Sequence, residues 1–435
     1  MGRVEDHWPP YSPAPKAPWN RRRVVHLHRR AGWGATWHEI ERDLDEGPDA
    51  ALGRLLDPEH RAEHNAVAGR AQELAAQGIA KQQAELLQAA WITRMWHGSD
   101  PLGEQLMLMW HNHLATSNLK VRDVALMNRH LATLREHARG PFEKLLRAVV
   151  IDPAMLVWLD ADQNRREHPN ENLARELMEL FTLGEGHYRE TDVRDAARAL
   201  TGWKLEDGKV RFDADENDGG EKEILGRRGR WNTDDLVRIL IEHPATSKRL
   251  AWRICDHFFA TDSVPPDALE ALASQLRQNG LDVGATVATV LRSSRFFDEA
   301  ELAQRVSPPA SYIVANSRSL ELHEAGFSPQ VAAAWMRSIG QDLLHPPGVG
   351  GWPGGRTWLG ATAMINRARF ASMVGEGTLY PGAPRLELEG LAKRNGFRGS
   401  AIEFASQLLF GEPARSVSQE NTLAALLTSP RAQFD

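Results

Sequence analysis

The chain has 435 residues, of which 42% are apolar and 25% are charged, and its formal net charge is −6. These values are ordinary for a globular protein with a sizeable core, and the acidic balance argues against a nucleic-acid partner. One cysteine excludes an intrachain disulfide, and no apolar run is long enough to cross a bilayer.

Residues 1–19 contain five prolines, which predict an extended arm ahead of the helical part of the chain. No apolar segment typical of a secretion signal occurs there. We therefore expect a cytoplasmic location by default, or export together with a partner that carries the signal. The basic stretch from Arg21 to Arg30 is predicted to be a helix whose arginines form a solvated face.

Helix signals then dominate. Thr36 and Glu39 have the spacing of a capping box, and Gly47-Pro48 predicts the end of that helix. Residues 59–97 are rich in Ala, Gln, Glu and Leu, and we expect one long helical stretch there. Because strands do not alternate with helices, a doubly wound or barrel fold is excluded. We predict a main helical domain over 20–375 and C-terminal helices over 376–435 that pack on it.

One segment, 203–226, departs from this pattern. Asp207-Gly208 stands between two short, partly apolar runs, which is a strong signal for a tight β-hairpin. An acidic, glycine-containing loop follows. The fold class predicted is therefore mainly α: a compact multi-helix domain with one small β-hairpin around 203–226.

The segment from Pro169 to Gly184 is predicted to be an amphipathic helix. Its apolar side consists of Leu173, Leu177, Leu180 and Phe181. Its polar side consists of Glu171, Asn172, Arg175, Glu176, Glu179 and Thr182. Spacing alone is typical of an exposed helix with ion pairs between residues four apart. The alternative is a polar face turned into a cleft, where the carboxylates would supply an acid and a base or hold a divalent metal.

Other motifs are less specific. His111 and His113 are two residues apart on a predicted helix, so at most one can face a site, and a histidine bonded to a carbonyl is the simpler explanation. The acidic loop fails as a calcium site because Asp218 and Ile224 replace the required glycine and glutamate. The glycine-rich stretch 346–358 lacks the Lys-Ser/Thr of a phosphate loop, so no nucleotide cofactor is indicated.

The stretch from Asn170 to Gly184, followed by Tyr188, Asp192 and Leu200-Thr-Gly-Trp203, resembles the bacterial family catalogued as domain of unknown function 1800. Further segments that match in order are 29–34, 110–113, 243–246 and 340–353. The resemblance covers about residues 20–375. This chain departs from the family pattern at Asn217, where the family often has histidine, and in 305–309, which lacks the family's glutamate.

The resemblance implies no settled reaction. It implies a gene that lies beside one of the family catalogued as domain of unknown function 1501, whose members look like relatives of sulfatases or alkaline phosphatases. It also implies a link to secreted or surface material. We hypothesise an enzyme acting on a glycan or other polar polymer, with or without a divalent metal. The alternative is a non-catalytic partner of the sulfatase-like protein. The excess of Trp over Tyr, 14 against 4, suits either sugar stacking or a large core.

The residues assigned to this hypothetical site fall into two groups. The catalytic candidates are Glu171, Arg175, Glu176, Glu179 and Asp192. The candidates for substrate binding are His113, Asn170, Asn172, Tyr188, Trp203, Asp218, Lys222 and Trp352.

Overall fold

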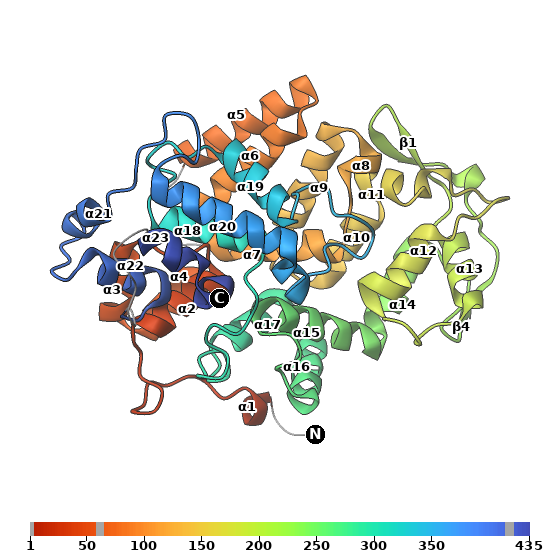
Figure 1. Cartoon of the computed structure of the whole chain (residues 1–435). Helices are drawn as coiled ribbons and strands as arrows, with labels where there is room; N and C mark the ends of the chain where they lie inside the picture. Colours follow the sequence, from red (N-terminus) through yellow and green to blue (C-terminus); the bar gives the residue numbers. More distant parts are fainter. Residues whose placement is uncertain (1–3, 58–64, 414–421) are drawn as a thin grey trace.

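The predicted fold class is confirmed by the structure, a computed structural model that describes residues 4–57, 65–413 and 422–435. The described chain is 61% helical, with 23 helices and two small antiparallel two-stranded sheets. Most of the helices pack around one another, and the two small sheets lie at one end of the molecule (Figure 1). None of the described helices is both long and apolar enough to cross a membrane.

Local signals set the helix boundaries in the first half of the chain. The capping box of Thr36 and Glu39 is present, and α3 ends at Gly47, whose φ of 86° costs glycine no strain. Pro48 then begins α4, where its missing N–H is not needed. The helices of this half are α1 Val4–His7, α2 Arg21–Ala31, α3 Trp37–Glu46, α4 Pro48–Leu56, α5 Asn65–Lys81, α6 Ala84–His97, α7 Pro101–His113, α8 Asn118–Val121, α9 Val124–Glu136, α10 Phe142–Val150 and α11 Pro153–Trp158.

The stretch predicted as one helical run over 59–97 is divided in the structure. Residues 58–64 lie outside the described part, and the remainder forms α5 and α6, which pack against each other. The break falls at Gln82, which has a φ of 52°. A residue in the left-handed region cannot continue a right-handed helix, so the chain turns there.

Helices from the second half of the chain pack against helices from the first half. Helix α19 packs on α6, α22 packs on α2, and α20 packs on α23, so that the blue C-terminal helices lie beside the red N-terminal ones (Figure 1). The helices of this half are α12 Asn172–Glu176, a π-helix Leu177–Thr182, α13 Glu190–Ala199, α14 Thr233–Glu242, α15 Pro244–Phe258, α16 Pro266–Gln278, α17 Val283–Leu291, α18 Pro309–Ser319, α19 Pro329–Ile339, α20 Ala361–Glu376, α21 Leu388–Arg394, α22 Ala401–Phe410 and α23 Thr422–Thr428.

The predicted hairpin is present, and a second one follows it. Strands β1 Trp203–Glu206 and β2 Lys209–Phe212 pair around Asp207 and Gly208, which both have positive φ, as a tight two-residue turn requires. Strands β3 Lys222–Ile224 and β4 Arg227–Gly229 pair around Leu225 and Gly226 with the same turn geometry. The segment expected to be only a loop therefore contains β3, which packs against α13.

The proline-rich N-terminal segment is tied to the helical body. Its one helical turn, α1, precedes the prolines. Trp8 is buried and donates from Nε1 to the carbonyl of Ala268 at 2.9 Å. The backbone N–H of Tyr11 donates to the carbonyl of Arg292 at 2.7 Å. Burial of the Trp8 indole holds this otherwise irregular segment in place.

The prediction of a solvated basic face on α2 is wrong. Arg23, Arg29 and Arg30 are buried, with Arg23 and Arg30 at 0% exposure. Their guanidinium groups donate to backbone carbonyls and to acidic groups from distant segments, including Asp435, which lies 3.2 Å from Arg30. Buried arginine is tolerated where such acceptors surround it.

Tryptophan serves mainly the core. Eight of the 14 tryptophans are buried: Trp8, Trp33, Trp37, Trp91, Trp96, Trp110, Trp352 and Trp358. Trp252 is 37% exposed and belongs to the small group of exposed large apolar side chains among the described residues. The high tryptophan content is thus explained largely by packing, and only a few indoles are placed to contact a ligand.

Candidate functional site

The helix predicted between Pro169 and Gly184 begins as α12 and then widens into the π-helix Leu177–Thr182. The wider turn rotates the side chains that follow it. Thr182, expected on the polar side, is buried, and its hydroxyl donates to the carbonyl of Leu177 at 2.5 Å. Because π-helical turns are rare and often occur at functional sites, this one marks the segment for closer inspection.

Four of the five predicted catalytic residues, Glu171, Arg175, Glu176 and Glu179, lie on the outer side of this helix. Arg175 pairs with Glu171 at 3.1 Å, as the spacing predicts, and also with Glu190 at 2.8 Å. The Tyr188 hydroxyl donates to Glu179 at 2.6 Å. Within the described residues, no third metal-ligating side chain joins Glu176 and Glu179. The structure therefore brings five predicted residues, Glu171, Arg175, Glu176, Glu179 and Tyr188, to one half-buried surface.

Two groups on this surface have shifted pKa values. Burial, together with the charge of Glu179, raises the pKa of Glu176 above its usual range. Burial and the hydrogen bond to Glu179 raise the pKa of Tyr188 to about 12. Glu176 therefore retains its proton to a higher pH than an exposed glutamate does.

Asp192, Asn170 and Asn172 have local structural contacts. Asp192 is buried and accepts backbone N–H groups of Arg189, at 2.8 Å, and Leu225, at 2.9 Å, so it fastens α13 to the second hairpin. Asn170 accepts the backbone N–H of Asn172 at 3.0 Å, at the start of α12. These contacts position the chain at the start of α12 and between α13 and the second hairpin.

The hairpin candidates form a separate cluster on the other side of α13. Asp218 pairs with Arg198 at 2.7 Å. The side chain of Lys222 is fully buried, and its ammonium donates to the carbonyls of Asp218 and Gly220. Asn217, which replaces the family histidine, donates to the carbonyl of Thr201 at 2.9 Å. Within the described residues, neither a hydrogen bond nor an ion pair joins this cluster to Glu176 or Glu179.

Trp203 completes this cluster. Its indole N–H donates to the hydroxyl of Thr233 at 2.9 Å, and its ring packs 5.0 Å from that of Phe212. The indole thus links β1 to the start of α14 and to its own hairpin partner strand, a packing contact that explains the residue without a ligand.

The C-terminal end of the π-helix contacts basic side chains from α7 and α15. The carbonyl of Leu180 accepts from Arg249 Nε at 3.3 Å, and the carbonyl of Phe181 accepts from His113 Nε2 at 3.0 Å. The last carbonyls of a helix lack intrahelical partners, and basic side chains commonly satisfy them. Because Nε2 of His113 donates, its Nδ1 accepts from Arg253 Nε at 3.3 Å. The segment 169–184 thus supports Arg249 directly, through the carbonyl of Leu180, and Arg253 indirectly, through His113.

Both arginines line a cavity of about 680 Å³, which we call the arginine cleft. Its walls come from α7, α15, the start of α18 and the glycine-rich loop before α20. Its charged side chains are Arg249, Arg253, Arg305, Arg356, Asp256 and Asp262. Its aromatic side chains are Trp252, Trp352, Trp358 and His257. Arg305 pairs with Asp435 at 2.9 Å, so Arg249, Arg253 and Arg356 against two aspartates leave the lining weakly cationic.

The α15 arginines are incompletely neutralised. Arg253 pairs with Asp256 at 3.3 Å, and burial lowers the pKa of Arg253. Burial also lowers the pKa of Arg249, whose guanidinium lies 4.8 Å from the centre of the Trp252 ring. Burial and the nearby Arg253 and Arg249 charges hold the pKa of His113 well below its usual range, so this imidazole is neutral at pH 7. Among the described residues, Asp256 is thus the one carboxylate that forms an ion pair with either arginine, and Glu185 adds a weaker charge interaction with Arg249.

Asn112 fixes the opposite wall. Its side-chain oxygen accepts the backbone N–H of Trp352 at 2.6 Å, and Gly351 lies directly against it with a φ of 76°. The ring of Trp352 packs 5.5 Å from that of His111. The Trp-His-Asn-His and Gly-Trp-Pro motifs, more than 200 residues apart, therefore form one structural unit beside the cleft.

The sequence predicts Trp352 and His113 as substrate-binding residues, but it does not single out the α15 arginines. A signal for them was present. One face of α15 carries polar and aromatic residues at helical spacing: Arg249, Trp252, Arg253, Asp256 and His257. This pattern alone is also typical of an exposed helix, so only its position over a cavity distinguishes it.

Comparison with known proteins gives one finding. A family model described as "Protein of unknown function (DUF1800)" matches residues 26–434, which extends beyond the 20–375 region of resemblance to nearly the end of the chain. Neither the curated proteins nor the solved structures include a match to the chain.

Proposed function

The chain belongs to this family of proteins of unknown function, DUF1800, and we propose that it binds an anionic, saccharide-like ligand in the arginine cleft. The observation that carries the proposal is the pair Arg249 and Arg253, two partly buried cations for which Asp256 is the one ion-pair partner among the described residues. Neither guanidinium has a buried donor without an acceptor, so their remaining donors face the open cleft, where a bound carboxylate or sulfate would accept from them.

The remaining lining restricts the class of ligand. The cavity volume is within the range of sites that hold small organic molecules, so a short saccharide fits better than a bare ion. Trp252 is exposed at the cleft, and indole faces stack on the apolar faces of sugars. Arg356 is exposed on the loop opposite α15 and adds a third cation. A uronic acid or a sulfated sugar combines the required charge and shape.

A more specific version of this proposal is that the protein also hydrolyses the ligand that it binds. Asp256 and Asp262 both line the cleft, and glycoside hydrolysis ordinarily needs two carboxylates. Turnover of an acidic oligosaccharide that is lost in Asp256→Asn would support a hydrolase. Binding without turnover would support a binding module.

We expect the protein to bind an oligogalacturonate at least tenfold more tightly than its neutral methyl ester, as measured by calorimetry. Arg253→Gln should weaken binding of the acid by roughly 10–100-fold, because a hydrogen bond between charged groups contributes about 1.5–3 kcal/mol. Arg356→Gln should weaken it about tenfold. Neither variant should change the affinity for the ester.

Arg238→Gln, a change of an exposed arginine on α14 that does not line the cleft, is the matched control and should leave both affinities unchanged. Because Arg356 is exposed, its variant separates ligand binding from folding. Equal affinity for acid and ester, or arginine variants that bind like the parent, would overturn the proposal.

A second candidate site is the pair Glu176 and Glu179, and the raised pKa of Glu176 favours it. A proton-retaining carboxyl beside a second carboxylate suits acid–base catalysis. If this pair is catalytic, Glu176→Gln and Glu179→Gln should abolish turnover of the ligand that the parent processes, with melting unchanged.

An exposed ion-pair role predicts the opposite. Each change would then cost only about 0.2–0.5 kcal/mol and would leave turnover intact. The exposed Glu167→Gln serves as the control. Loss of turnover in the control as well would point to a general charge effect and remove the pair from consideration.

The alternative of a non-catalytic partner for a sulfatase-like protein calls for an exposed apolar face. The exposed large apolar side chains of the described residues are Leu119, Phe212, Trp252 and Ile365, which come from four different elements. This distribution gives the partner hypothesis less support than the cleft gives to ligand binding.

A further inference from the structure

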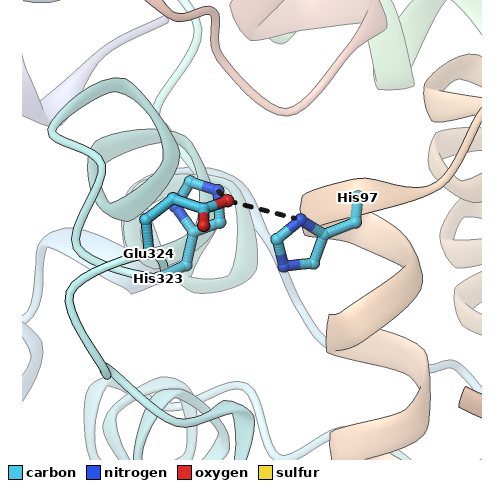
Figure 2. Close-up of side chains that lie close together, drawn as sticks. All are labelled: His97, His323 and Glu324. Carbon is cyan, nitrogen blue, oxygen red and sulfur yellow. Dashed lines mark ion pairs between the residues drawn. The ribbon is translucent and has the colours of Figure 1, made fainter. Parts of the chain in front are cut away.

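Three potential metal ligands meet where the end of α6 faces the turn after α18 (Figure 2). His97 is the last residue of α6, and His323 and Glu324 lie in the turn after α18. Figure 2 shows the three side chains directed toward one another across the gap between these elements. One ligand atom from each lies within 4.8 Å of the others. Among the described residues, this is the one group of three such side chains that comes together.

His323 is held in the orientation of a ligand. Its Nδ1 lies 3.3 Å from the carbonyl of Ser317, which can only accept, so Nδ1 carries the proton and Nε2 has the free lone pair. The Ser317 hydroxyl in turn accepts from the indole of Trp96 at 2.8 Å. Metal-binding histidines usually have their second ring nitrogen fixed by such a carbonyl. His323 Nε2 points at Glu324, 3.4 Å from its carboxylate.

The other two ligands can adjust. His97 Nδ1 lies 3.9 Å from the Glu324 carboxylate, and its side chain is 32% exposed, while that of Glu324 is 68% exposed. Ligand atoms around tetrahedral zinc are about 3.4 Å apart, given metal–ligand distances of about 2.1 Å. Closing the gap therefore needs only side-chain rotation of the two accessible residues toward the fixed His323.

The surrounding charge does not oppose a cation. Arg318 is the basic group beside this cluster, and it pairs with Glu39 at 2.6 Å and donates to the carbonyls of Trp96 and Gly34. Its charge is thus compensated by groups outside the cluster. Glu324 is left to neutralise part of the charge of a bound ion.

We propose that His97, His323 and Glu324 form a binding site for a divalent transition metal, with zinc as the best fit. Two imidazoles and one carboxylate are a set typical of zinc, whereas calcium and magnesium prefer oxygen ligands. Three protein ligands leave at least one coordination position for water, and exposed Glu324 places that position at the surface. The ion would join the end of α6 to the turn after α18.

The test uses the full chain without a polyhistidine tag. We expect the apo protein to bind one Co²⁺ with visible absorption typical of a four- or five-coordinate ion, and Zn²⁺ to displace it. Zn²⁺ should also raise the melting temperature, because an ion that binds only the folded state stabilises it. His97→Ala and Glu324→Gln should each weaken Co²⁺ binding at least tenfold and reduce the shift in melting temperature.

His38→Ala, a change of an exposed histidine on α3, is the matched control and should bind metal like the parent. His323 is nearly buried, so its alanine variant could lose stability for other reasons, and the two accessible ligands carry the test. A parent protein that binds no Co²⁺ would overturn the proposal, as would His97→Ala and Glu324→Gln variants that bind it undiminished.

Discussion

Gly351→Ala is expected to lower the free energy of unfolding by about 3 kcal/mol, the largest loss we expect from a single methyl group in this protein. A Cβ at this position would fall inside the contact distance of both the side-chain oxygen and the carbonyl oxygen of Asn112. The φ of 76° adds the strain of a left-handed backbone for a non-glycine residue. The carbonyl belongs to α7, which cannot retreat, so the loop that carries Trp352 must move.

Denaturant unfolding measures this loss directly. Gly348→Ala is the matched control in the same loop, because a Cβ there meets no atom within 4 Å and the position has no positive φ. The control should leave stability nearly unchanged. If Gly351→Ala and Gly348→Ala unfold at the same denaturant concentration, the close contact between Asn112 and the loop is refuted. Displacement of this wall should also weaken ligand binding in the arginine cleft.

Asp43→Asn is expected to cost about 3 kcal/mol, the scale of breaking a buried ion pair. Asp43 has 1% exposure, and its carboxylate accepts from His28 at 2.7 Å, Arg54 at 2.6 Å and Arg42 at 2.9 Å. It thus links α2, α3 and α4 through one side chain. Asparagine keeps the shape but replaces a charged acceptor with a neutral one.

The same carboxylate makes stability depend on pH. Burial alone would raise the pKa of Asp43, but the hydrogen bond and charge of His28 and those of Arg42 hold it well below its usual range. Its stabilisation is therefore complete above the unfolded-state pKa of about 3.9 and is lost as the pH falls further. Asp43→Asn should flatten the unfolding profile between about pH 4 and pH 2. Asp45→Asn, on the exposed side of α3, should not.

Much of the secondary structure could be predicted because its determinants are local. The capping box of Thr36 and Glu39 and the turn at Asp207 and Gly208 act through neighbours within a few residues, and both appear as predicted. The ion pair of Glu171 with Arg175 follows from helical spacing. The second hairpin escaped prediction because its strands are three residues long and owe their pairing to packing on α13.

The candidate site could be predicted only in part. The family motifs identify which segments carry unusual polar residues, yet their partners are remote in the chain. Arg253 reaches His113 across 140 positions, and Trp352 reaches Asn112 across 240. A polar helix face has the same spacing whether it meets water or a cavity, so α15 could not be distinguished from an exposed helix.

Sequence by itself therefore determined the helical class of this protein, its family and the positions of most helix ends, because hydrogen bonds and side-chain packing within a few residues set these features. The tertiary structure alone decided that Arg23 and Arg30 are buried. It also decided that the helix predicted over 169–184 widens at Leu177–Thr182, and that the last carbonyls of this helix accept hydrogen bonds from Arg249 and His113. Burial and pKa values depend on which distant groups displace water around a side chain, and that information is absent from local sequence patterns.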